Sequence, residues 1–277
     1  MSRADRARAD PPAPDEPGTM TFWEHLEELR ARIVKMLLAF ALGAGVAWVF
    51  REELLLLVTQ PFLDAWAKSD LSTKASLHFP APTSLFVAYL KLAFLGGGLL
   101  AFPLMLWQVW AFVAPGLYTK EKRLAVPFVL ASCALFAGGG LFGFKLAFPL
   151  AFQFLLGMGG PVAGSSFEVT PTVMIQDYLD FVLQMLLAFG IAFELPVLIF
   201  FLALAGVVDH VKLIRFFRYF VVVAFVVSAI ATPPDVTSQL LLAIPLCVLY
   251  ALGVGVAWLV TRSRRVADKR ADRLGED

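Results

Sequence analysis

The stretch "HLEELRARIVKMLLAFALGAGVAWVF", His25–Phe50, passes from dense charge into an almost unbroken apolar run. The apolar part, Ile33–Phe50, is close to the length of about 20 residues that a helix needs to cross about 30 Å of hydrocarbon. Over the whole chain 59% of the residues are hydrophobic and 16% are charged, against about half and one quarter in soluble domains. The sequence therefore predicts an all-α integral membrane protein.

Six segments are predicted as transmembrane spans. They are Ile33–Phe50, Thr83–Trp107, Leu124–Leu150, Tyr178–Ala205, Phe216–Ala231 and Gln239–Val260. The stretch "TPPDVTSQ", Thr232–Gln239, separates the last two, because two prolines and an aspartate cannot continue a lipid-exposed helix. The fifth span is short, which predicts local thinning of the bilayer around it.

Lysine and arginine residues predict the orientation, because cytoplasmic loops are enriched in them. They lie before span 1, between spans 2 and 3, between spans 4 and 5, and after span 6, whereas 151–176 and 232–238 carry none. Both termini are therefore predicted to be cytoplasmic. Residues 1–19 are polar and proline-rich and predict a disordered tail, residues 20–260 form the six-span domain, and residues 261–277 form a charged, basic tail.

The segment before span 1 predicts an amphipathic helix that leads into the membrane. Leu26, Leu29 and Ile33 fall on one helical face, and Glu28 stands four residues before Arg32, a spacing that favours an ion pair. Two interpretations remain open from this pattern. The helix is either an interfacial anchor whose charges only solvate it, or an acidic docking site for a basic partner.

The loop "PGLYTKEKR", Pro115–Arg123, carries a single acid, Glu121. This glutamate either pairs locally with Lys120 or Arg123, or joins Glu28 as a pair of carboxylates at the cytoplasmic face. Two carboxylates would suit a ligand with adjacent guanidinium groups, because arginine forms bidentate bonds to carboxylates that lysine cannot copy.

Glu194 lies inside span 4, two residues before Pro196. A charged side chain at mid-bilayer costs about 2.5–3.5 kcal/mol, and the proline predicts a kink nearby. Three interpretations remain open. Glu194 is held by an internal partner such as Lys91, contacts the transmembrane helix of another protein, or serves with Lys91 in an ion-coupled transporter.

Four other residues are interpreted as mainly structural. Gln108 is expected to make a hydrogen bond at a helix end, and Asp235 to cap the helix that starts near Val236. Gln239 opens span 6 and is a candidate for an interhelical bond. Pro61 is expected to shape the first external loop, where an interfacial helix is predicted.

No metal site or cofactor is expected. The three histidines are scattered, and the two cysteines lie in apolar runs. An intramembrane hydrolase is disfavoured, because the serines inside the apolar segments have no accompanying histidine. A scaffold without cargo binding is a further alternative.

Four motifs resemble the TatC family, the multispanning receptor subunit of twin-arginine protein translocases. "HLEELRAR" is similar to the N-terminal motif of that family, and "WQVWAFVAPGLYTKEKR" to its first cytoplasmic loop. "FGIAFELPV" is similar to its fourth helix, and "TPPDVTSQLLLAIPLCVLY" to its last external turn and sixth helix. The matched stretches are His25–Arg32, Trp107–Arg123, Phe189–Val197 and Thr232–Tyr250.

The resemblance implies a receptor in the bacterial inner membrane for twin-arginine signal peptides of folded cargo. Glu28 and Glu121 are similar to the acids that face the arginine pair, whereas Arg30, Arg32 and Lys91 match basic positions of the family. It also implies an oligomeric complex with single-span partners of the TatA and TatB type, intramembrane partner contacts at Glu194 and Gln239, and transport driven by the proton-motive force. Neither a cofactor nor a nucleic-acid partner is expected. One departure is Ala251 after Tyr250, where several relatives carry an acid.

Overall fold

The computed structural model describes residues 22–69, 71, 74–113, 125–162, 164, 166–232 and 234–274, with side chains between Trp23 and Arg262. Within this part of the chain, six helical segments are long and apolar enough to cross a membrane, which confirms the six predicted spans. They run over Trp23–Val49, Pro82–Phe112, Val126–Leu156, Ile175–Leu204, His210–Ala231 and Val236–Arg262. The predicted tail 1–19 lies outside the described residues.

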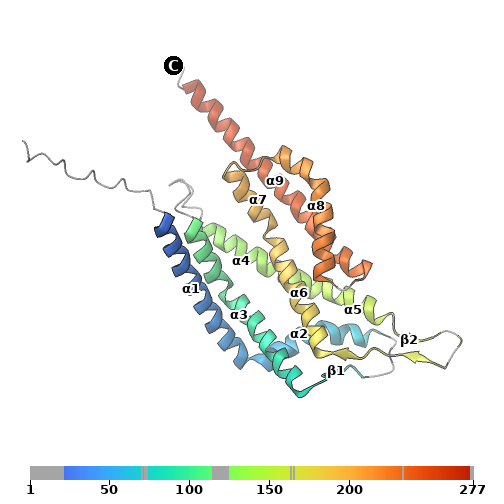
Figure 1. The fold of residues 1–277 in the computed structure, drawn as a ribbon. Helices are drawn as coiled ribbons and strands as arrows, with labels where there is room; N and C mark the ends of the chain where they lie inside the picture. Colours follow the sequence, from blue (N-terminus) through green and yellow to red (C-terminus); the bar gives the residue numbers. More distant parts are fainter. Residues whose placement is uncertain are drawn as a thin grey trace, which may run out of the picture.

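The first two spans pack side by side as α1 (Phe22–Val49) and α3 (Pro82–Val113) (Figure 1). Glycine permits this close approach, because a Cβ atom on Gly97 would lie 2.5 Å from the backbone nitrogen of Ala44. The amphipathic segment is the first turns of α1. It therefore extends span 1 as one continuous helix and is not a separate helix lying along the membrane surface.

Spans 3 and 4 each consist of more than one helical segment. Span 3 is α4 (Ala125–Phe142), a short π-helical segment η3 (Gly143–Ala147) and α5 (Phe148–Leu156). Span 4 is α6 (Ile175–Phe193) and α7 (Leu195–Leu204). Pro196 stands in the first turn of α7, where a missing N–H is tolerated. The kink predicted at this proline is found as a break at Glu194.

Spans 5 and 6 pair as α8 (His210–Ala231) and α9 (Val236–Leu274). The fifth span is longer than predicted, because α8 begins six residues earlier than expected, but at 22 residues it is the shortest of the six candidate spans. Its N-terminus is capped by the Asp209 carboxylate, which accepts a 3.1 Å hydrogen bond from the Val211 N–H. The 22 residues of α8 span about 33 Å, so length alone no longer argues for thinning of the bilayer.

Two pairs of very short strands, which the sequence did not predict, gather at one end of the bundle. β1 (Leu77–His78) pairs in parallel with β4 (Val173–Met174), and β2 (Gly160–Pro161) pairs antiparallel with β3 (Glu168–Val169). The first pairing brings the starts of α3 and α6 together. We call this end the strand face, and the opposite end, where α1 begins and α3 ends, the N-terminal face.

Helix α2 (Arg51–Ala67) lies at the strand face and contacts α3 and α5 (Figure 1). It is the interfacial helix predicted for the first loop, and Pro61 is buried inside it. Phe62 of α2 packs against Phe152 and Tyr178, with ring centroids 5.9 and 5.3 Å away. The Tyr178 hydroxyl donates a 2.7 Å hydrogen bond to the Val58 carbonyl. We call Val58, Phe62, Phe152 and Tyr178 the aromatic core.

Candidate binding site

Glu28 and Arg32 form an ion pair on α1 near the N-terminal face. The Arg32 Nε donates a 3.0 Å hydrogen bond to Glu28 Oε1, and a second guanidinium nitrogen donates to the same oxygen. Since one turn of helix separates residues four apart, the sequence alone sets this geometry. The predicted pair is confirmed.

The end of α3 completes the site. The Arg32 guanidinium donates a further hydrogen bond, 3.3 Å long, to Gln108 Oε1. One turn beyond Gln108, the Phe112 ring stacks on His25 with centroids 4.3 Å apart. We call His25, Glu28, Arg32, Gln108 and Phe112 the helix-end site. Gln108 is therefore part of this site, and its hydrogen bond joins two helices.

The second carboxylate oxygen of Glu28 is the most informative atom of the helix-end site. Oε2 is buried and has no hydrogen-bond partner among the described residues. Among the described residues, the His25 Nδ1 atom lies 3.9 Å from Oε2, which is too far for a hydrogen bond. An unpaired buried acceptor costs about 1–3 kcal/mol, and more when it is charged. Glu28 therefore keeps unused hydrogen-bonding capacity at this oxygen.

The other predicted residues of this region differ in their surroundings. Arg30 is exposed on α1 and makes no hydrogen bond or ion pair within the described part of the chain. Glu121 lies outside the described residues, in the stretch 114–124 that follows α3. Whether Glu28 and Glu121 share one surface therefore stays a prediction.

Lys91 is paired with Asp180 of α6 and not with Glu194. The two acids lie at different depths in the bundle, and this difference decides which of them Lys91 meets. Depth is counted here from the strand face at 1.5 Å per residue. Lys91 lies about 14 Å along α3 and Asp180 about 8 Å along α6, whereas Glu194 lies about 28 Å along α6. The hypothesis of an internal Lys91–Glu194 pair is therefore wrong. The transporter interpretation loses its paired charges as well.

Glu194 faces α4, where Ser132 and Cys133 are its electrostatic neighbours. Glu194 Oε1 and the Ser132 hydroxyl are both buried and lie close to each other, although the contact between them does not have the geometry of a good hydrogen bond. A polar group inside a bilayer normally has one. The Glu194 carboxyl therefore has hydrogen-bonding capacity that its own chain does not fully use.

The helix cap predicted at the start of span 6 is confirmed. Asp235 Oδ1 accepts a 2.7 Å hydrogen bond from the Ser238 N–H and thereby caps α9. The Gln239 side chain makes no hydrogen bond within the described part. Gln239 lies only about 5 Å into α9 from the strand face, so it stands far in depth from Glu194. Tyr250 is buried and donates to the Leu213 carbonyl at 2.9 Å, whereas Ala251 is exposed.

Sequence reasoning missed two features of these sites. It did not single out Asp180. Counting residues from the strand face places Asp180 of span 4 and Lys91 of span 2 at similar depths, which is the signal that could have revealed their pairing. Sequence reasoning also missed the contact of Gln108 with Arg32. No signal in the sequence marks that contact, because it depends on how α1 and α3 cross.

These features define a multi-span helical membrane protein with a cluster of hydrogen-bonded polar side chains at one end of its bundle. A family model for the Sec-independent protein translocase protein TatC matches residues 24–245. The chain is 40% identical over 258 residues to that protein from Koribacter versatilis, covering 93% of this chain and 92% of the relative. Against the protein from Aquifex aeolicus it is 37% identical over 250 residues, covering 90% and 100%.

The fold agrees with a solved structure. A crystal structure described as the twin-arginine translocase receptor TatC superimposes with a TM-score of 0.74 at 37% identity, covering 86% of this chain and 100% of that one. The chain belongs to the TatC family. It is thus a multi-span component of the Sec-independent protein translocase in the bacterial plasma membrane and not an enzyme, which confirms the resemblance.

Proposed function

We propose that the helix-end site is the receptor for the paired arginines of twin-arginine signal peptides on folded cargo. The observation that carries this proposal is the state of Glu28. One carboxylate oxygen is held by Arg32, and the other is buried without a hydrogen-bond partner. An incoming guanidinium would satisfy this second oxygen with a charge-assisted bond, which is about twice as strong as a neutral one.

The neighbours of Glu28 favour arginine over lysine in the ligand. Arg32, which Gln108 holds in turn, fixes the carboxylate from one side, so a ligand must approach Oε2 along the remaining direction. A planar guanidinium offers several donors in fixed geometry there, whereas an ammonium is a compact and strongly hydrated charge. Phe112, stacked on His25, supplies an apolar ring for the hydrocarbon part of the ligand.

Glu121 is proposed as the second acid. It would contribute from the loop 114–124, which directly follows the helix that carries Gln108 and Phe112. We further propose that the N-terminal face is cytoplasmic. The absence of Lys and Arg from 232–238 at the strand face and their abundance around 212–218 at the start of α8 support this orientation.

A peptide experiment tests the receptor proposal. The purified full chain in lipid nanodiscs is titrated with a labelled peptide that contains two consecutive arginines and with its Lys-Lys counterpart. We expect the arginine peptide to bind at least tenfold more tightly, because charge-assisted bonds contribute about 1.5–3 kcal/mol. Equal affinity for the two peptides would refute a site built for guanidinium groups.

We also propose that Glu194 contacts the transmembrane helix of a small single-span partner of the TatA or TatB type. The carboxyl group inside the fourth span, whose Oε1 atom makes no hydrogen bond of good geometry within the described residues, supports this contact. Gln239 would meet the same partner near the strand face, since its side chain makes no bond inside the described chain. Transport by such a complex would draw on the proton-motive force, as the family implies.

Substitution of Glu194 separates recruitment of the partner protein from recognition of the signal peptide. We expect Glu194→Ala to retain the affinity for the arginine peptide, because Glu194 lies about 10 Å from Gln108 in depth and on a different helix, and to lose most export of folded cargo in cells. Glu194→Gln keeps a hydrogen-bonding group and should keep part of the export. Glu53→Ala, which removes an exposed carboxyl from α2, is the control. Full export by the Glu194→Ala variant would exclude Glu194 from the mechanism.

A further inference from the structure

A cavity of about 450 Å³ opens between α2, α3, α4, η3 and α6. Its walls are apolar along most of their length, with Leu57, Leu99, Phe136 and Leu187 among the lining residues. Only two lining residues carry polar side chains, Gln60 of α2 and Lys145 of η3. A cavity of this size and lining is typical of sites that hold small, largely hydrocarbon ligands.

Lys145 has no ion-pair partner among the described residues. Its side chain is exposed, and its ammonium lies 5.6 Å from the centre of the Phe144 ring. A lysine in a transmembrane segment is costly unless it reaches an anion or the interface. Lys145 lies 11 residues before Leu156, about 16 Å from the strand-face end of span 3 along the helix, and a lysine side chain at such a depth extends toward the nearer interface to reach an anion.

The π-helical segment explains why the ammonium stands at this cavity. The wider turn of η3 inserts one extra residue into span 3 and rotates the side chains that follow. Lys145 therefore shares a wall with the apolar residues Leu141 and Phe144. Such segments occur frequently at functional sites.

We infer that this cavity holds an acyl chain of an anionic phospholipid whose phosphate pairs with Lys145. The apolar walls match a hydrocarbon chain. The single unpaired cation at the cavity matches the one strong negative charge of the lipid headgroup. This lipid site is independent of the helix-end site and goes beyond the receptor function.

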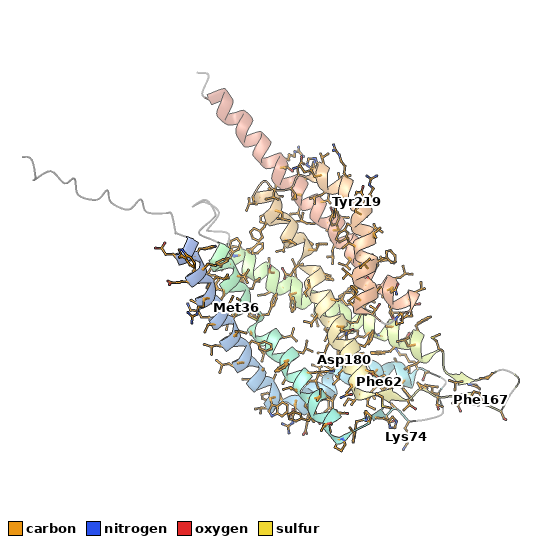
Figure 2. The ribbon with its side chains drawn as sticks, viewed as in Figure 1. Met36, Phe62, Lys74, Phe167, Asp180 and Tyr219 are labelled. Atoms are coloured by element: carbon orange, nitrogen blue, oxygen red, sulfur yellow. The ribbon has the colours of Figure 1, made fainter. Side chains whose placement is uncertain are left out.

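Native mass spectrometry of the full chain tests the inference with matched variants. The protein is released from micelles that contain phosphatidylglycerol or phosphatidylcholine, and retained lipid is counted. Lys145→Gln should reduce retained phosphatidylglycerol about fivefold, since a basic side chain at a membrane surface contributes about 1 kcal/mol toward an anionic lipid. Lys74→Gln, which removes an exposed lysine at the strand face away from the cavity (Figure 2), should leave retention unchanged.

A second pair of variants fills the cavity and keeps the charge. Gly140 lines the cavity, and a Cβ atom there would meet no atom within 4 Å. Gly140→Leu should therefore fold normally and reduce retention of both lipids. Gly138→Leu also points into open space but lies outside the cavity, so it should retain lipid as the unchanged chain does.

Three outcomes would overturn the lipid site. The first is equal retention of phosphatidylglycerol by Lys145→Gln and the unchanged chain. The second is no loss of lipid with Gly140→Leu. The third concerns a photoreactive residue at Leu99 in resting membranes. If a photoreactive residue at position 99 crosslinks to a protein helix or to the signal peptide and not to lipid, the cavity holds a polypeptide partner.

Discussion

The aromatic core at the strand face and the helix-end site at the N-terminal face place polar atoms in opposite situations. In the aromatic core the Tyr178 hydroxyl is buried and satisfied by the Val58 carbonyl at 2.7 Å. In the helix-end site Glu28 Oε2 is buried and unsatisfied. A satisfied buried group stabilises a unique packing, whereas an unsatisfied one costs stability until a ligand arrives. The first region should therefore govern folding and the second recognition.

The largest effect is expected from Phe62→Ala in the aromatic core. Phe62 is almost fully buried (Figure 2), and removing a buried phenylalanine typically costs about 3–5 kcal/mol. The free energy of unfolding, measured by denaturant titration in detergent, should fall by this amount. The affinity of the folded fraction for the arginine peptide should not change.

Leu63→Ala is the matched control for Phe62→Ala. Leu63 follows Phe62 on the same helix and is 44% exposed, so its loss should cost clearly less than the loss of Phe62. A loss below about 1 kcal/mol for Phe62→Ala would show that the aromatic core does not govern stability.

An intermediate effect is expected from Glu28→Gln. This substitution should change the affinity for the peptide and not the free energy of unfolding. Loss of a charge-assisted pair should weaken the affinity for the arginine peptide by about 10- to 100-fold, equivalent to about 1.5–3 kcal/mol. The affinity of the unchanged chain should also fall as salt rises, because mobile ions screen partly exposed charges. Isothermal titration at two salt concentrations measures both effects.

Glu27→Gln removes an equal charge from the neighbouring, exposed position and should change the affinity less than threefold, since exposed pairs contribute about 0.2–1 kcal/mol. Similar losses for Glu27→Gln and Glu28→Gln would mean that the ligand senses only the total charge of α1. The contrast between the two regions would then disappear.

The smallest effect is expected for the pair between Lys91 and Asp180. The two side chains are 29% and 47% exposed, and pairs with this access to solvent contribute about 0.2–1 kcal/mol. A double-mutant cycle of Lys91→Met and Asp180→Asn should give a coupling energy in this range in unfolding experiments. A coupling energy above about 2 kcal/mol would place this pair among the buried interactions.

The sequence was sufficient for features that depend on neighbours along the chain. Hydropathy located all six spans, helical spacing predicted the bond between Glu28 and Arg32, and Asp235 caps α9 as its position suggested. Each of these follows from the periodicity or the end of a single helix. The start of α8 was misjudged because charged residues in its first turns were assigned to a loop.

Features that depend on how helices cross could not be predicted. Gln108 meets Arg32 across 76 positions of sequence, and Lys91 meets Asp180 across 89. Those contacts need the depth and rotation of two helices, which hydropathy does not specify. The π-helical segment was missed for a related reason, since one extra residue in a turn leaves the apolar pattern of span 3 nearly unchanged.

The length of α9 has a consequence for the electrostatics of the chain end. Arg262 stacks over Trp258 at 5.1 Å, a combination typical of a membrane–water boundary. The helix continues for 12 further positions to Leu274, a rod of about 18 Å. That reach exceeds the Debye length of about 8 Å at physiological salt. Where the rod continues along the direction of span 6, the attraction between the charges of residues 269–274 and the lipid headgroups is largely screened, which leaves those charges available to soluble molecules in the surrounding water.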